Sequence, residues 1–270
     1  MMIPPIQDVR SEVAKGLRGV FFDIDDTITT SGKLPLVSYK ALWDLRNAGL
    51  KIVPVTGRPA GWCDHIARMW PVDGIVGENG AFYFWFDEKQ HKLGKRFLYP
   101  DNIRAANRRR LLQIQDEILT RVPGSALASD HPYRETDTAI DYCEDVKPLG
   151  QKAVEQICEI FKKHGATCKV SSIHVNGWFG EYDKLGMTKT LARERWDLEL
   201  DAEKERFLFC GDSPNDEPMF QYFPVTAGVS NILRFAAGMG YLPSFVASQE
   251  GGEGFAEIVE ILLKKRQTSR

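Results

Sequence analysis

Several features that mark membrane, secreted or nucleic-acid-binding proteins are missing from this sequence. No apolar run is long enough to span a bilayer. Residues 1–16 are polar, include two prolines and lack the apolar segment of a signal peptide. The formal net charge is only −2, from 35 basic and 37 acidic residues, so neither nucleic acid nor a membrane surface is expected as the main partner. We therefore expect a cytoplasmic protein.

Cysteine is also sparse and lacks the spacing of a metal-binding or disulfide framework. The five cysteines are widely separated, with no C-x-x-C pair, which favours free thiols in a reducing compartment and argues against a zinc site. They are Cys63, Cys143, Cys158, Cys168 and Cys210. The most prominent cluster of basic residues, the three arginines at 108–110, is interpreted as the solvated face of a helix.

What the sequence does contain is a regular alternation of strand and helix patterns near its start. Short apolar runs and helical periodicities follow one another at residues 19–22, 36–47, 51–55, 59–69 and 73–76. This order favours a parallel sheet with helical crossovers.

The pattern changes after residue 86 and returns near residue 183. The intervening segment predicts helices at 101–121 and 148–164 and alternating strands at 136–143 and 167–175. The later part predicts helices at 185–196 and 254–265 and strands at 207–210, 224–228 and 244–247. We therefore predict an α/β protein with a doubly wound, Rossmann-like parallel-sheet core and an inserted α+β cap. The core comprises residues 1–86, with a polar extension at 1–16, and 179–270; the cap comprises 87–178.

Three acids are crowded at the end of the first predicted strand. Asp23, Asp25 and Asp26 follow the apolar run 19–22 directly. Two carboxylates ~4 Å apart repel by roughly 4 kcal/mol at an effective dielectric constant near 20. A bound cation, or protonation of one acid, must offset this repulsion, and a divalent metal with oxygen ligands is the natural candidate.

Two further polar clusters follow core strands, and ligands of open parallel sheets bind beyond the carboxyl ends of the strands. These are residues 56–58, with the sequence Thr-Gly-Arg, and residues 211–216, with the sequence Gly-Asp-Ser-Pro-Asn-Asp. Lys184 opens a predicted helix nearby. Taken singly, each cluster has an ordinary explanation as a turn or helix cap, as do Asp26 and Thr27, and a single lysine is usually a surface residue. Their joint occurrence predicts one site.

The combined motifs resemble the haloacid dehalogenase superfamily of phosphohydrolases. The matching positions are Asp23-x-Asp25-x-Thr27, Thr56-Gly57-Arg58, a lysine, and Gly211-Asp212-Ser213-x-Asn215-Asp216. The placement of the insertion resembles the subgroup with a large α/β cap (type C2B), which includes Cof-type sugar phosphatases, sucrose-phosphate phosphatase, mannosyl-3-phosphoglycerate phosphatase and phosphomannomutase. Residues 78–81 and 252–254 also look like Cof-type core segments.

The resemblance implies a role for each matching residue. Asp23 would be the nucleophile that forms an aspartyl-phosphate, and Asp25 would act as general acid and base. Asp23, Asp212 and the backbone carbonyl of Asp25 would bind Mg²⁺. Ser213, Asn215 and Asp216 would surround the metal site. Thr56 and Gly57 would hold the phosphoryl oxygens, and Arg58 would either contact the phosphate or brace its loop. Lys184, or alternatively Lys189, would neutralise the charge of Asp23 and the phosphate.

The cap would supply substrate specificity. Candidates for substrate contact lie near the return to the core, although each one has a core or hinge role as its alternative. They are His174, Asn176, Trp178, Glu181 and Tyr182. Glycines flank the aromatic residues of segment 176–180, which predicts a hinge.

The expected function is a Mg²⁺-dependent phosphomonoester hydrolase acting on a small phosphorylated metabolite, such as a sugar phosphate or phosphoglycerate derivative. A phosphomutase resembling phosphomannomutase shares the nucleophile and the cap, so it stays open as an alternative. A non-catalytic binding scaffold is a third reading, which the intact acids and lysine disfavour. Nothing in the sequence predicts the oligomeric state.

Overall fold

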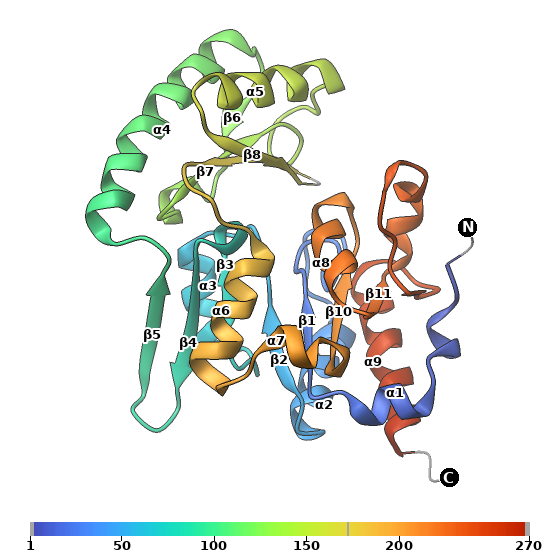
Figure 1. Ribbon diagram of the computed structural model, residues 1–270. Helices are drawn as coiled ribbons and strands as arrows, with labels where there is room; N and C mark the ends of the chain where they lie inside the picture. Colours follow the sequence, from blue (N-terminus) through green and yellow to red (C-terminus); the bar gives the residue numbers. More distant parts are fainter. Residues whose placement is uncertain (1–2, 172, 268–270) are drawn as a thin grey trace.

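The computed structural model describes residues 3–171 and 173–267 of the 270-residue chain. At its centre lies a five-stranded parallel sheet with the order β12-β11-β10-β1-β2 (Figure 1). Its strands are β1 (Gly19–Phe22), β2 (Lys51–Pro54), β10 (Phe207–Gly211), β11 (Val225–Gly228) and β12 (Phe245–Val246). Every residue of β1 and β10 is buried, as expected for a sheet covered on both faces.

Successive residues of β1 point to opposite faces of this sheet, and each face has its own apolar core. Phe22 packs in a cluster with residues of helices on one face, whereas Phe21 belongs to a second cluster on the other. The helices on the Phe22 face are α1 (Ser11–Gly16), α2 (Leu36–Asn47), α3 (Ala60–Met69) and α9 (Gly251–Gln267). Those on the Phe21 face include α6 (Lys184–Trp196), α7 (Leu200–Glu203) and α8 (Glu217–Tyr222). The doubly wound core predicted from the sequence is therefore confirmed.

A small antiparallel sheet extends the core beyond β2. It consists of β3 (Ile75–Gly77), β4 (Phe82–Asp87) and β5 (Lys92–Phe97). A parallel bridge between Val55 and Val76 joins it to the main sheet. Residues 92–97, which the sequence analysis assigned to the inserted segment, pair with β4 instead, because Phe97 packs its ring against Phe82 and Phe84. The cap layer thus begins after this hairpin.

The cap is a separate layer above the core (Figure 1). Its sheet, with the order β6-β7-β9-β8, is entirely antiparallel. The strands are β6 (Ala126–Leu127), β7 (Asp137–Asp141), β8 (Thr167–Val170) and β9 (His174–Trp178), and the helices are α4 (Asp101–Arg121) and α5 (Gln151–Lys163). Leu111 and Ile114 of α4, Phe161 of α5 and Val175 of β9 share one buried cluster. The single strand expected at 167–175 is therefore a pair, β8 and β9.

Short 3-10 turns connect these elements. They are η1 (Ile6–Asp8), η2 (Glu78–Gly80), η3 (His131–Tyr133), η4 (Lys204–Arg206), η5 (Pro214–Asp216), η6 (Ser230–Arg234) and η7 (Ala236–Gly238). Residues 108–110 lie exposed on α4, as predicted. Among the described residues, no helix has the length and apolar character needed to cross a membrane.

Candidate active site

Three buried carboxylates meet at the carboxyl ends of β1 and β10. Asp23 follows β1, and its backbone N–H donates to the carbonyl of Cys210 at 3.0 Å. Asp212 follows β10, and Asp216 lies in η5 just beyond it. One carboxylate oxygen of each acid lies within 4.8 Å of the others. The exposed fractions of the three residues are 7%, 3% and 0%, so water screens their repulsion poorly.

Lys184 is the cation that touches this cluster. Its Nζ lies 2.8 Å from Asp23 Oδ2 and 3.0 Å from Asp216 Oδ1. Asp183 caps the start of α6 by accepting a hydrogen bond from the N–H of Gly186 at 2.7 Å, which fixes Lys184 at the first position of the helix. The alternative lysine, Lys189, pairs with Asp201 at 2.8 Å on the surface. The geometry therefore places Lys184, and not Lys189, at the acids.

The electrostatics of the cluster leave it short of positive charge. Burial raises the pKa of Asp23 to about 7, against the lowering effect of Lys184. Burial, together with the charges of Asp216 and Asp23, raises the pKa of Asp212 well above its ordinary value. Burial opposes the charge of Lys184, but the two neighbouring acids outweigh it and raise its pKa. With three acids against one ammonium group, a divalent cation would offset the remaining repulsion, and buried carboxylate oxygens suit Mg²⁺.

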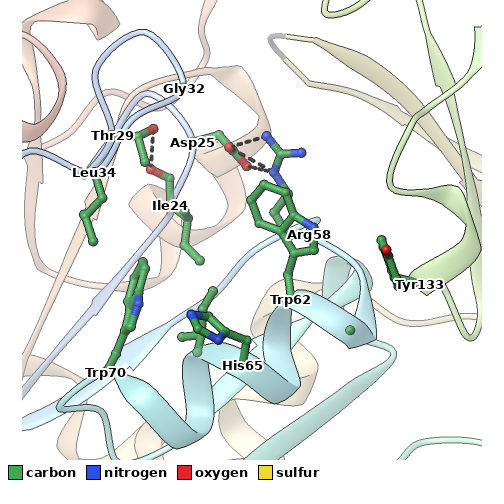
Figure 2. Close-up of a pocket in the computed structure, with 12 residues that line it drawn as sticks. Ile24, Asp25, Thr29, Gly32, Leu34, Arg58, Trp62, His65, Trp70 and Tyr133 are labelled. Carbon is green, nitrogen blue, oxygen red and sulfur yellow. Dashed lines mark hydrogen bonds and ion pairs between the residues drawn. The ribbon is translucent and has the colours of Figure 1, made fainter.

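Asp25 is held apart from this cluster by Arg58. The Nε of Arg58 lies 2.9 Å from Asp25 Oδ2, and its Nη2 lies 2.8 Å from Asp25 Oδ1, which forms a two-pronged ion pair (Figure 2). The same guanidinium reaches the cap, at 3.2 Å from both Asp130 Oδ2 and Glu144 Oε1. Arg58 therefore braces Asp25 and also ties the core to the cap. The sequence left two roles open for Arg58, contact with the phosphate or bracing of its loop, and this geometry favours the bracing role.

The loop after β2 is positioned by its own hydrogen bonds. Thr56 is fully buried, and its hydroxyl accepts a hydrogen bond from the N–H of Arg58 at 3.0 Å. Gly57 lines the small cavity beside Asp23, whereas Thr56 does not. A Cβ at Gly57 would lie 3.2 Å from the side-chain amide of Asn79, so a larger residue would crowd the loop. The phosphate role predicted for Thr56 remains a prediction.

The small cavity beside Asp23 is lined by both layers. The core contributes Asp23, Asp25, Gly57, Arg58, Asn79, Asp212, Ser213 and Asn215, and the cap contributes Arg134, Ser171, Ile173, His174 and Asn176. Two of the predicted cap residues, His174 and Asn176, are therefore at the site. Trp178 is not among the lining residues: it is 1% exposed and stacks on Tyr182 with ring centroids 5.4 Å apart. It packs in the interior because β9 is buried along its whole length.

The hinge predicted at residues 176–180 falls only partly outside regular structure. Asn176 and Trp178 belong to β9, where they pair with the neighbouring strands. Gly180 has a φ of +116°, a backbone conformation that favours glycine. The chain therefore leaves the cap sheet only after residue 178.

Several charged residues at this site were missed by the sequence analysis. Glu144 Oε2 lies 2.8 Å from His174 Nε2, and this contact, with help from Arg58, lowers the pKa of Glu144 to about 2. Arg134 contacts the carbonyl of Gly57 at 3.1 Å. These residues lie in the irregular connections around β7, where no spacing pattern marks them before the cap is folded over the core.

The sequence itself matches the profile of one family. Residues 20–117 match the haloacid dehalogenase-like hydrolases. No match is found among curated protein sequences.

Solved structures show the same fold over nearly the whole chain. The C-terminal domain of a C. albicans trehalose-6-phosphate phosphatase has a TM-score of 0.71 at 15% identity, covering 97% of this chain and 98% of that one. A Thermoplasma acidophilum protein has a TM-score of 0.69 at 18% identity, covering 92% and 98%. The sucrose-phosphatase from Synechocystis has a TM-score of 0.60 at 16% identity, covering 92% and 98%. A structure named as a subclass IIB sugar phosphatase of this superfamily has the same fold, with a TM-score of 0.61 at 12% identity, covering 92% of this chain and 98% of that one.

Proposed function

We propose that this protein is a Mg²⁺-dependent phosphomonoesterase that acts through an aspartyl-phosphate on Asp23. The observation that carries the proposal is the meeting of Asp23, Asp212 and Lys184 at the ends of β1 and β10. A buried carboxylate beside a buried ammonium group and two further acids is poorly arranged for stability. It is well arranged for a nucleophile whose charge must be balanced while it attacks an anionic ester.

The three buried carboxylates fit a magnesium ion. Asp23, Asp212 and Asp216 would hold it, because their oxygens lie within 4.8 Å of one another and the metal prefers carboxylate ligands with some retained waters. When bound, Mg²⁺ supplies positive charge that offsets the negative charge of the phosphoryl oxygens and of the attacking carboxylate. Asp216, which the sequence analysis placed behind the metal, thus joins the set of candidate ligands.

The first half of the reaction transfers the phosphoryl group to the protein. A carboxylate oxygen of Asp23 attacks phosphorus in line, the bond from phosphorus to the ester oxygen breaks, and its electron pair stays on that oxygen. In this proposal Asp25 takes up a proton and leaves its ion pair with Arg58 when the substrate binds. It then gives that proton to the departing ester oxygen, which leaves as an alcohol. Lys184, at 2.8 Å from Asp23, holds the nucleophile and balances the charge of the incoming phosphate.

The second half returns the protein to its starting state. Asp25, now a carboxylate, takes a proton from a water molecule as that water attacks phosphorus, and the bond between Asp23 and phosphorus breaks. Inorganic phosphate leaves, with Asp23 ionised and Asp25 protonated again. The ion pairs from Arg58 to Asp130 and Glu144 hold the cap over the core, which limits the access of bulk water during the first half.

A sugar phosphate or phosphoglycerate derivative is the proposed substrate class. Two structures with the same fold are named as a trehalose-6-phosphate phosphatase and a sucrose-phosphatase. In this chain, polar side chains of the cap, among them His174 and Asn176, line the small cavity beside Asp23. We propose that the cap between β5 and α6 selects the substrate while the core performs the chemistry.

The test is a phosphate-release assay with sugar phosphates and phosphoglycerates, with Mg²⁺ added or removed by chelator. We expect turnover that requires Mg²⁺. Asp23→Asn should reduce it by at least about 10³-fold, because an amide cannot form the acyl-phosphate. Brief mixing with substrate should also leave a phosphoryl group on residue 23, detected by mass spectrometry of the quenched protein.

Asp116→Asn is the matched control, because it makes the same change on the exposed face of α4 in the cap. It should leave turnover unchanged. Wild-type turnover in folded Asp23→Asn protein, or full activity in excess chelator, would contradict the proposed function.

A further inference from the structure

A second, much larger cavity adjoins the candidate active site (Figure 2). Its volume is about 450 Å³, against about 30 Å³ for the cavity beside Asp23. The two cavities share Asp25 and Arg58 as wall residues. The small cavity has room for little more than about one or two waters, so the part of a substrate beyond its phosphate needs another space. The larger cavity supplies that space at the carboxylate that would protonate the leaving group.

The walls of this larger cavity are mostly aromatic and apolar. Trp62 and His65 project from α3, and Trp70 follows the same helix; Ile24 and Leu34 face them from the loop after β1 (Figure 2). An apolar, aromatic-lined cavity of several hundred Å³ with a few polar groups is the usual form of a small-molecule site.

The polar groups of the cavity argue against a second phosphate as its occupant. Arg58 is the strong cation among the lining residues, and it is already paired with Asp25. Its guanidinium also lies 4.3 Å from the ring of Trp62. The hydroxyl of Thr29 is occupied by the N–H of Asp26 and the carbonyl of Ile24. The remaining surface suits a group that is apolar on one face and carries its oxygen toward Asp25.

Two of the aromatic side chains are available to such a group. Trp62 is 40% exposed and Tyr133 is 58% exposed, although large aromatic rings gain from burial. Tyr133 comes from η3 of the cap and packs against Gly61 of α3, where a Cβ would lie 2.8 Å from the Cβ of Tyr133. Core and cap therefore build the cavity together, with Tyr133 at the cap side.

We propose that this cavity binds the leaving group of the substrate, and that this group is a ring with an apolar face that stacks on Trp62 while its ester oxygen lies at Asp25. The inference rests on the proposed phosphatase chemistry and assigns part of the specificity to α3 of the core. The face of an aromatic ring and the C–H face of a pyranose both offer an apolar surface that can stack on an indole ring. The kinetic test below distinguishes these two kinds of leaving group.

The kinetic test compares three esters: phenyl phosphate, glucose 6-phosphate and the ring-free glycerol 3-phosphate. Trp62→Ala should lower kcat/KM for a ring ester by about tenfold relative to glycerol 3-phosphate, since lost apolar contacts in a pocket change specificity by about this factor. Trp62→Phe keeps a ring and should restore most of the difference. Trp43→Ala, at a tryptophan 44% exposed on α2, is the matched control and should change none of the three values.

The pattern of losses identifies the ring. A loss confined to phenyl phosphate assigns an aryl alcohol, and a loss confined to glucose 6-phosphate assigns a pyranose; either supports the proposal, as does a loss with both. An equal fall for all three esters would overturn it, because that is the result expected if Trp62 only braces Arg58. An unchanged ratio would overturn it as well.

A binding measurement separates this proposal from the proposed function. The chain has six tryptophans, and the indole N–H resonance of Trp62 can be assigned in a ¹⁵N spectrum as the one lost in Trp62→Phe. Phenol or methyl glucoside, which carry no phosphate, should shift that resonance but not the resonance lost in Trp43→Ala. If the Trp62 resonance shifts but the protein hydrolyses none of the esters, the result contradicts the proposed function and supports ring binding in the cavity. Turnover without any shift from either compound would overturn the cavity.

Discussion

Two clusters of buried acids lie within the described part of the chain, and they are neutralised in different ways. The site cluster is Asp23, Asp212 and Asp216 with Lys184, at the end of the parallel sheet. The joint cluster is Glu78, Asp130 and Asp137 with Arg134, where the cap meets the core. Each has three carboxylates and one cation of its own, so a comparison of their other partners shows what each is built to do.

In the joint cluster, the acids have many donors. The carboxylate of Glu78 accepts hydrogen bonds from the N–H of Ala60 on α3 and from three successive N–H groups and a hydroxyl at residues 135–137. Arg134 lies 3.0 Å from both Asp130 and Asp137. Asp137 also accepts from Asn176, and Asp130 from Arg58. Charge-assisted hydrogen bonds thus satisfy the acids without any added ion.

In the site cluster, the donors are few. Asp23 accepts from the N–H of Ile24 at 2.8 Å, Asp212 accepts from the hydroxyl of Thr27 at 2.9 Å, and Asp216 accepts from the N–H of Asp212 at 3.1 Å. Apart from Lys184, these partners are neutral. Buried carboxylates with so few hydrogen-bond donors lower the stability of the fold. We infer from the contrast that the joint cluster stabilises the contact between cap and core, whereas the site cluster is completed by a bound cation.

Among the described residues, Lys184 is the cation that contacts the site cluster, and its removal should have the largest effect on activity. Lys184→Met should lower kcat/KM for phosphate esters by about 10²–10³-fold or more, because charge on the nucleophile and phosphate is no longer balanced. Steady-state kinetics at saturating Mg²⁺ measures this. Lys189→Met, five residues along the same helix and paired with Asp201 on the surface, is the control. Equal effects of the two substitutions would contradict the assignment of Lys184.

Removing Arg134 from the joint cluster should lower the stability of the fold; because Arg134 also lines the cavity beside Asp23, the effect is measured by unfolding and not by activity. Arg134→Met leaves Asp130 and Asp137 as buried acids short of charge, which typically costs 3–5 kcal/mol of unfolding free energy. Urea unfolding followed by circular dichroism measures it. Arg121→Met, which breaks a half-exposed pair with Glu117 on α4, should change the unfolding free energy far less, because solvent screens an exposed ion pair. A loss of similar size in both variants would show that the joint cluster does not stabilise the contact between cap and core.

The sequence predicts these two clusters unequally, for a physical reason. Asp23 and Asp212 follow buried strands, and parallel strands bring their carboxyl ends to one edge, so local patterns were enough to expect them together. Lys184 could be preferred over Lys189 because it begins a helix after Asp183. In the joint cluster, by contrast, Asp130 and Arg134 belong to the cap, whereas their partners Arg58 and Glu78 come from the core. Sequence periodicity does not show how two such layers meet.

The same limit explains the other differences from expectation. The strand at residues 92–97 is half polar, and its pairing with β4 depends on Phe97 meeting rings across the hairpin. Trp178 was a candidate for substrate contact because it lies near the return of the chain to the core. The sequence pattern of β9 does not show that both faces of that strand are buried. The cavity at Trp62 depends on Tyr133 arriving from the cap, which sequence spacing does not reveal.

The thermal stability of the two clusters should respond differently to Mg²⁺. Mg²⁺ should raise the Tm of the wild-type protein, because an ion that binds only the folded state stabilises it by about 2.7 kcal/mol at one hundred times its Kd. Asp212→Asn should abolish that rise and, without metal, should unfold at an equal or higher temperature, since it removes one of three repelling charges. Differential scanning calorimetry with and without Mg²⁺ measures both.

Asp130→Asn is the matched change in the joint cluster. It should lower the Tm without metal, because Arg134 and Arg58 each lose a charged partner, and it should keep the full response to Mg²⁺. The inferred division would be wrong if the response vanished in Asp130→Asn or survived in Asp212→Asn.

The smallest expected effect is a pH dependence at Glu78. Burial, with the charge of Asp137, raises the pKa of this carboxyl to about 7, despite Arg134 and the hydrogen bonds from residues 135 and 136. In the unfolded chain its pKa is near about 4.3. Between these values the folded state holds a proton that the unfolded state has released, so the contribution of Glu78 to stability is full at low pH and declines as the pH rises toward 7.

Glu78→Gln removes this titration. The amide cannot accept as many hydrogen bonds, so the variant should be less stable at every pH, but the difference in unfolding free energy between wild type and variant should shrink from pH 5 to pH 7, by on the order of 1 kcal/mol or more. Urea unfolding at several pH values measures this slope. The control is Glu203→Gln: a hydrogen bond with Arg18 lowers the pKa of Glu203, so Glu203 stays ionised in both states and its difference should be flat over that range. A flat difference for Glu78→Gln would mean that Glu78 is ionised in the folded state over this pH range. Its hydrogen-bond donors and Arg134 would then be enough to keep the buried carboxylate charged.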